Sequence, residues 1–404
     1  MNDLLKSQTR RVSRQAFMIL TALIWTRTVL IDYVKAVILR LPLIKNFADE
    51  CILLAFLVVI FFALPNFQPQ LPDIFFIIIS VSVYMLEWLF YQSGSIYFSM
   101  YASDFLLKSL PLYIVGVSLA SMEEDYKEIL YKLLYILSVL TLFFDIIYHL
   151  LVRESMTYIE SLYEGNMSLA YNLLPHCCYI SWHAVRKAKP WSVILCVISA
   201  LYLLLLGTRG AALINLLFIA IAIVAGKDIK KSVVKALVIG CIFGGFLSSH
   251  LYETTLRWLE TLAKRLGLSV RIFERLLNGG ISDSNGRDKI RERVLMKIHQ
   301  RPAMGNGMYS DRVLLGGTYS HNIVLELWID FGVIFGTLLL ATLIFILFRG
   351  YVKEKNINEK GMILSLTSAT LLKLFLSGSW LNESFLFLVL GLSVGAIRMA
   401  HKSK

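Results

Sequence analysis

The chain has 404 residues, of which 57% are hydrophobic and only 17% charged, with a mean hydropathy of +0.66 and a formal net charge of +12. A soluble protein carries about a quarter charged residues and cannot bury this much apolar surface, so a soluble globular enzyme is excluded. Apolar runs of roughly 17 to 25 residues follow one another, and each is long enough to cross a bilayer as a helix.

These runs are continuous rather than alternating, which indicates helices, because lipid admits only helices and closed barrels. We therefore predict an all-α polytopic membrane protein with about twelve transmembrane helices and one large, partly helical loop outside the cytoplasm. The predicted spans are roughly residues 16–38, 49–64, 73–91, 104–120, 129–151, 168–185, 190–206, 210–225, 232–250, 322–348, 361–377 and 381–398.

Basic connections set the predicted orientation, because short cytoplasmic loops are enriched in Lys and Arg. With twelve spans, the strongly basic connections fall in the cytoplasm. The chain then divides into nine spans over residues 1–250, an extracytoplasmic loop over 251–320 and three spans over 321–404. The basic stretches are the amino terminus, 186–189, 227–235, 349–360 and 398–404.

The segment 251–320 is the longest polar stretch, and its basic residues outnumber its acidic ones. Leucines at helical spacing over 251–277 predict an amphipathic helix that can lie along the membrane surface. A turn over 283–286 precedes a second predicted helix from about Arg287 to Gln300, which ends at Pro302.

Three arginines are candidate anion-binding residues. Arg209 follows a leucine run and precedes small residues, so it either contacts an anionic group or is a snorkelling arginine at a span end. Arg287 and Arg291 are one helical turn apart and can grip a diphosphate together. Interleaved Asp288 and Glu292 favour the alternative, a solvated helix with surface ion pairs.

His321 is the candidate catalytic residue, at the outer end of the predicted span 322–348. Histidine titrates near neutrality and is the commonest general base, although a lone interfacial histidine can also be an amphipathic anchor. Asn322 and Glu326 are candidate supporting residues, and Glu326 either orients His321 or pairs with an arginine.

Other chemistry has little support. The remaining histidines show no metal-ligand spacing, and no Walker loop or dinucleotide fingerprint occurs, so we expect no metal and no cofactor. The net charge divides between orienting loops and the segment 251–320, so a nucleic-acid partner is not expected. Acidic residues inside predicted spans are costly and therefore candidates for function: Asp32, Glu87, Asp145, Asp330 and Glu383.

Three motifs occur in order: GTRGAA at 207–212, NGR at 285–287 with RPAMGNG at 301–307, and SHNIVLE at 320–326 with FGVIFG at 331–336. Together with the topology, they resemble the O-antigen ligase/polymerase superfamily of bacterial envelope glycosyltransferases. The similarity covers mainly residues 195–345. It implies a fold of the GT-C type in the bacterial cytoplasmic membrane, with the active site facing the periplasm or the exterior.

The resemblance also implies an activity, transfer of a glycan from an undecaprenyl diphosphate carrier to a sugar hydroxyl without metal or nucleotide. Family arginines that match Arg209 and Arg287 hold the diphosphate, and the family histidine that matches His321 lies at the reaction centre. Arg291 is proposed from helical spacing alone. The expected partners are the lipid-linked glycan donor, a sugar or lipid A-core acceptor, the lipid bilayer and a chain-length regulator.

Three functions stay open at this point. A polymerase transfers the chain to another lipid-linked repeat unit, and the compact loop favours it. A ligase transfers the glycan to lipid A-core in lipopolysaccharide biosynthesis. A flippase or transporter of the lipid-linked oligosaccharide would suit twelve spans, but the candidate residues gather at one membrane face rather than at mid-membrane.

Overall fold

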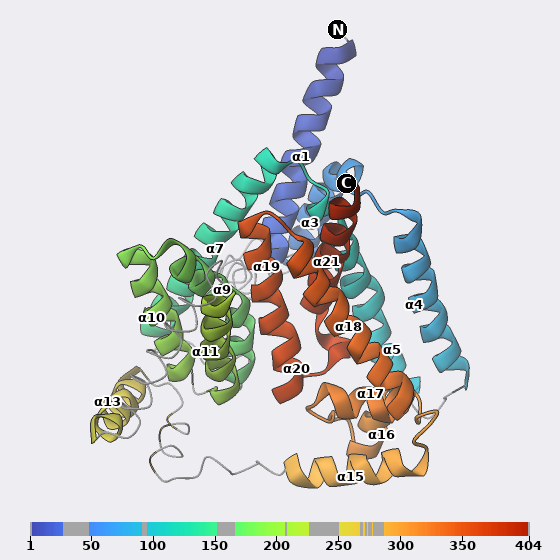
Figure 1. Ribbon diagram of the computed structural model, residues 1–404, viewed down its shortest axis with the longest axis vertical. Helices are drawn as coiled ribbons and strands as arrows, with labels where there is room; N and C mark the ends of the chain where they lie inside the picture. Colours follow the sequence, from blue (N-terminus) through green and yellow to red (C-terminus); the bar gives the residue numbers. More distant parts are fainter. Residues whose placement is uncertain are drawn as a thin grey trace. The chain divides into compact units, whose positions relative to one another are not determined.

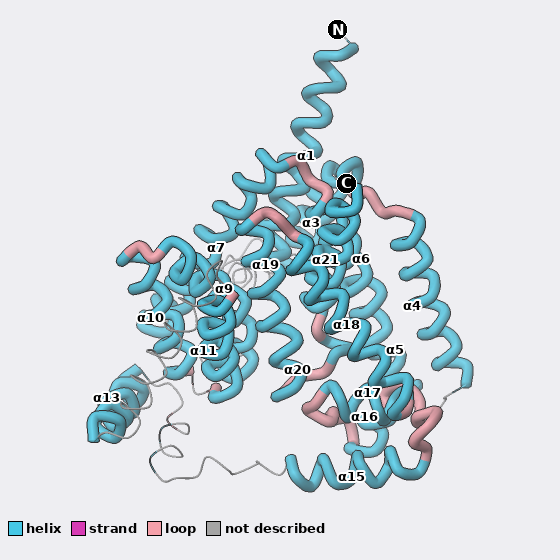
Figure 2. The backbone as a smooth tube through the Cα atoms, in the orientation of Figure 1, coloured by secondary structure: helices cyan, strands magenta, loops and turns pink. Residues whose placement is uncertain are grey.

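The computed structural model is helical throughout the part of the chain that it describes, and no strand occurs in that part (Figures 1 and 2). These residues form two compact units, one of residues 1–14, 63–128 and 283–404 and the other of residues 15–62 and 129–282. The described residues are 2–26, 48–90, 95–151, 166–206, 208–225, 250–266, 287–402 and the single positions 270, 273 and 277.

The first unit contains the carboxyl-terminal third of the chain. Its helices are α4 (Leu71–Phe90), α5 (Ser95–Asp104), α6 (Leu110–Ala120), α15 (Arg287–Gln300), α16 (Ser310–Leu315), α17 (Ile323–Phe331), α18 (Val333–Lys353), α19 (Ile357–Thr367), α20 (Lys373–Leu376) and α21 (Ser384–Lys402). Two π-helical segments, Phe105–Ser109 and Ser368–Leu372, join α5 to α6 and α19 to α20.

Glycines bring α6 and α21 into close contact at the centre of this unit. A Cβ atom at Gly391 would lie 2.0 Å from the carbonyl oxygen of Tyr113, and one at Gly116 would lie 2.2 Å from that of Leu388. Gly391 and Gly395 are four residues apart on α21, the small-residue spacing that lets membrane helices approach closely.

The second unit is built around α9 (Asn166–Lys187), which packs on α10 (Pro190–Leu205) and α11 (Arg209–Val224). The indole of Trp25 donates a hydrogen bond to Ser138 at 2.9 Å, and His176 also contacts that hydroxyl. The remaining helices are α3 (Ala48–Ala63), α13 (His250–Leu266), most of α7 (Glu124–Leu151) and the carboxyl-terminal part of α1 (Asn2–Thr26).

The predicted helical membrane protein is confirmed in its coarse form. Among the described residues, five helices are long and apolar enough to cross a membrane: Leu71–Phe90, Ile96–Ala120, Glu124–Ile147, Val333–Lys353 and Ser384–Lys402. Three shorter apolar helices occur at Leu54–Asn66, Pro190–Leu205 and Arg209–Val224. The predicted span 232–250 lies outside the described residues except for its last position.

Two predicted boundaries need correction. The first helix begins at Asn2 rather than near residue 16, so the basic residues before the apolar run are already helical. The predicted span 322–348 is wrong as one helix, because it divides into α17 and α18 at Gly332, which has φ +82°. The predicted amphipathic helix 251–277 is confirmed as α13 over His250–Leu266, and most of the rest lies outside the described residues.

Candidate functional site

Two packed helices, α15 and α17, carry the candidate site in the first unit. Helix α15 packs on α17 through Val294 and Ile298, which are buried against Leu325 and Ile329. Helix α15 begins at Arg287 and ends at Gln300, as predicted. The interface therefore fixes the position of α17, whose amino-terminal end follows His321 directly.

The RPAMGNG segment locks the other end of α17. The amide of Asn306 donates to the carbonyl of Ile329 at 2.8 Å, and the amide of Val333 donates to the carbonyl of Pro302 at 2.7 Å. A Cβ atom at Gly332 would lie 2.3 Å from the carbonyl oxygen of Ala303, so the backbones meet where no side chain fits. This contact breaks the predicted span and joins two of the three motifs.

His321 lies in the turn before α17 with φ +58°, a left-handed conformation that is uncommon for a residue with a side chain. Its ring centroid is 4.2 Å from that of Tyr319, and its Nδ1 atom is buried with no hydrogen-bond partner among the described residues. Strain of this kind persists only where the surroundings hold it, and it concentrates at functional sites.

Asn322 is the amino-terminal cap of α17. Its side-chain oxygen accepts hydrogen bonds from the amides of Val324 and Leu325, and its Nδ2 donates to the carbonyl of Phe375 at 3.1 Å. The predicted supporting role therefore takes the form of a cap that ties the turn around His321 to the end of α20.

Arg287 reaches the same end of α20, where its Nη1 donates to the carbonyl of Leu376 at 2.9 Å. Burial lowers the pKa of His321 and the nearby Arg287 charge lowers it further, while Asp311 acts in the opposite direction. The net shift favours the neutral imidazole, which is the form that a general base requires.

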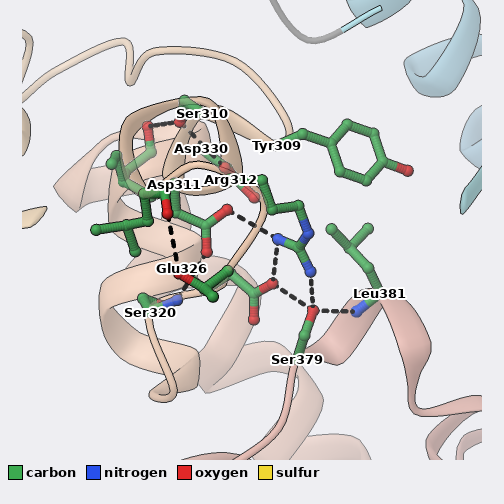
Figure 3. A network of polar contacts seen from close by, with 12 residues as sticks. Tyr309, Ser310, Asp311, Arg312, Ser320, Glu326, Asp330, Ser379 and Leu381 are labelled. Carbon is green, nitrogen blue, oxygen red and sulfur yellow. Dashed lines mark hydrogen bonds and ion pairs between the residues drawn. The ribbon is translucent and has the colours of Figure 1, made fainter. Parts of the chain in front are cut away.

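A buried ionic network lies beside the turn and is bonded to it through Ser320 (Figure 3). Arg312 is fully buried, and its Nη1 donates to Asp311 at 2.8 Å and to Glu326 at 3.0 Å. Asp311 in turn accepts the amide of Ser320 at 2.9 Å, one residue before His321. The Nη2 atom of Arg312 donates to Ser379, which also donates to Glu326. The network thus ties α16, α17 and the loop after α20 together.

This network holds more acidic than basic groups. Arg312 faces three buried carboxyl groups, those of Asp311, Glu326 and Asp330. Burial and the charge of Asp311 raise the pKa of both Glu326 and Asp330, against the opposing effect of Arg312. One Asp330 oxygen accepts from Ser310 at 3.3 Å, and the other is buried with no partner among the described residues.

An apolar cavity of about 580 Å³ lies against α17 in the same unit. Ile323 and Leu327 of α17 line it, together with Trp380 of the loop after α20. Tyr84 also lines it and shares a 2.5 Å hydrogen bond with Tyr309. His321 and Arg287 therefore lie near the amino-terminal end of α17, and residues of α17 itself line an apolar cavity.

The other predicted residues stand on α15, α11 and α17. Arg291 is exposed on α15 one turn beyond Arg287. Arg209 is the first residue of α11 and belongs to the second unit, where Gly210 meets the hydroxyl of Tyr171. Glu326 pairs with Arg312, which realises the second of its two predicted roles. No metal-binding group of His, Cys, Asp and Glu occurs in the described part of the chain.

Two residues of the site have no obvious sequence signal. Arg312 and Asp311 stand in a polar segment where surface exposure is the ordinary expectation, and only the folded structure shows that both are fully buried. The adjacent opposite charges Asp311-Arg312 between the Gly307 and Gly316 turns are the sole local indication.

Neither the models of known protein families nor the curated proteins give a match to this chain.

Proposed function

We propose that this chain is a metal-independent glycosyltransferase of the bacterial cytoplasmic membrane, a surface-polysaccharide or O-antigen polymerase. It would transfer a glycan from undecaprenyl diphosphate to a sugar hydroxyl of another lipid-linked repeat unit on the outer face. The observation that carries the proposal is the left-handed His321 in the turn before α17, with the cation Arg287 bound to the nearby carbonyl of Leu376.

The chemistry follows from these groups. The imidazole of His321 takes the proton of the acceptor hydroxyl as its oxygen attacks the anomeric carbon. The bond from that carbon to the diphosphate oxygen breaks, and the negative charge that develops there is stabilised by Arg287. Attack in line with the leaving group inverts the anomeric centre.

The apolar cavity supplies the second half of a lipid-linked substrate site. Its lining is almost entirely hydrocarbon, from Phe76 on α4 to Leu390 on α21. Pockets of 300 to 1,000 Å³ roughly match small ligands, so this one takes part of a long isoprenoid chain while the head group lies at the cations.

The test is a ladder gel of envelope polysaccharide from a strain that lacks the protein, complemented with wild type, His321→Ala or His299→Ala. His299 is the matched control, because it is exposed at the end of α15 and bonds a carbonyl of its own helix. Single repeat units on lipid A-core with His321→Ala, and a normal ladder with His299→Ala, support the polymerase.

Two other outcomes would change the conclusion. Long chains retained on the undecaprenyl carrier, with bare lipid A-core, would indicate a ligase. A full ladder with His321→Ala would remove the catalytic role of this residue and favour a transporter of the lipid-linked oligosaccharide.

A further inference from the structure

Lys373 occupies an unusual backbone position beside the candidate site. The π-helical segment Ser368–Leu372 directly precedes it and interrupts the helix that α19 and α20 would otherwise form together. Single-turn π segments inside helices are uncommon and occur frequently at functional sites, because the extra residue turns the following side chains to a new direction.

The side chain of Lys373 is half-buried and forms an ion pair with Glu383, across the loop that joins α20 to α21. Its carbon stem runs past Gly378, where a Cβ atom would lie 3.5 Å from the lysine Cε. That loop also carries Ser379, a member of the Arg312 network. Lys373 is thus held at the edge of the site rather than free on the surface.

The same short helix anchors the other site residues. The last carbonyls of α20, those of Phe375 and Leu376, accept from Asn322 and Arg287. The positive charge of Lys373 also lowers the pKa of the Tyr319 hydroxyl, opposing burial, and the ring of Tyr319 lies against that of His321. Helix α20 therefore begins at Lys373, and its last carbonyls bind Arg287 and Asn322, the residue that follows His321.

We propose that Lys373 is a further anion-binding residue of this site, which exchanges its Glu383 partner for a phosphate oxygen of the lipid-linked diphosphate. The proposal rests on the proposed function and adds a second cation to Arg287 in the first unit. A partly exposed lysine–carboxylate pair contributes little net free energy, so a diphosphate with more negative charge can displace the carboxylate. Lysine suits this exchange because its ammonium group binds phosphate as a point charge on a flexible stem.

A purely structural role for the pair makes a different prediction. If Lys373 and Glu383 only hold the loop, removing either partner damages the site in the same direction. If Glu383 competes with the diphosphate, Glu383→Gln strengthens binding or leaves it unchanged, while Lys373→Met weakens it. The sign of the Glu383→Gln effect therefore separates the two roles.

The experiment measures binding of undecaprenyl diphosphate without a glycan to the full chain in nanodiscs of zwitterionic lipid. The variants are Lys373→Met, Lys373→Arg, Glu383→Gln and the double Lys373→Met/Glu383→Gln. Lys360→Met on α19 is the control, because Lys360 contacts the ring of Tyr351 and lies outside the site. We expect Lys373→Met and the double variant to raise the Kd roughly tenfold or more, and Lys373→Arg to retain most binding.

The double variant covers the case in which Lys373→Met fails to fold because Glu383 is left unpaired. Inorganic pyrophosphate competes in a separate arm and isolates the head group, and phosphatidylglycerol competes in another. Equal competition by phosphatidylglycerol would show a general anionic-lipid site and overturn the proposal. The role of Lys373 would be overturned, and the proposed function left intact, if the wild type binds normally and the Kd is unchanged in Lys373→Met and in the double variant. Absence of binding by the wild type would overturn both.

Discussion

Replacing Arg312 with Met is expected to destabilise the protein strongly. The guanidinium bonds Asp311, Glu326 and Ser379 in a site with no solvent exposure, and the substitution leaves these carboxylates without their cation. Breaking a buried ion pair by removing one partner costs about 3–5 kcal/mol. The stability of Arg312→Lys should lie between those of the wild type and Arg312→Met, because one ammonium group cannot reproduce the contacts that the guanidinium makes on two sides.

The assay is the free energy of unfolding in mixed micelles titrated with a denaturing detergent. Arg301→Met is the control, since Arg301 is exposed just after α15, and its change should stay within about 0.5 kcal/mol. The double variant Arg312→Met/Glu326→Gln should lose less than the sum of the single losses, because the pair is coupled. An Arg312→Met loss below about 1 kcal/mol would refute the buried network as a source of stability.

Three further substitutions test the site and its scaffold. The acid limb of kcat/KM should lie below pH 6.5, the ordinary pKa of histidine, and Arg287→Gln should move it upward because a cation that lowers the pKa of His321 is lost. Asn322→Ala should cost about 0.5–2 kcal/mol of unfolding free energy by removing the cap, whereas Asn322→Asp keeps the acceptor. Gly391→Ala should lower the free energy of unfolding by about 1–3 kcal/mol, because the new Cβ meets the carbonyl of Tyr113 on α6. The same titration measures it, and the half-exposed Met399→Ala on the same helix should cost less.

Local signals in the sequence predicted much of the helical architecture. The helix from Arg287 to Gln300 begins and ends as predicted, because turn-forming residue types precede it in the sequence and Pro302 follows it. Asn322 was predicted as a supporting residue, and it stands before an apolar run, the ordinary place of the cap that it forms on α17. These features depend on neighbouring residues, so the sequence alone is enough to find them.

Features that depend on distant contacts were missed or misjudged. Hydropathy averaged over 322–348 conceals the break at Gly332, whose cause is the backbone of Pro302–Gly305 packed against it. The burial of Arg312 likewise depends on Glu326 and Ser379, which approach from other elements. Neither contact leaves a periodic pattern in the chain.

The position of Glu326 determines how variants of this residue should be interpreted. Both of its oxygens are engaged, one by Arg312 and Ser379 and the other by the amide of Trp380. The charges that act on His321 are instead those of Arg287 and Asp311. Glu326 therefore holds the loop after α20 and does not orient the imidazole directly.

Glu326→Gln should accordingly lower the free energy of unfolding and leave the acid limb of kcat/KM in place. Asp311→Asn should move that limb to lower pH, because the carboxylate that raises the pKa of His321 is lost. Both variants weaken the same network around Arg312, so each controls for the stability loss of the other. If the acid limb of kcat/KM moved equally in Glu326→Gln and Asp311→Asn, Glu326 would act on His321 as directly as Asp311 does. That result would contradict the contacts of the buried network.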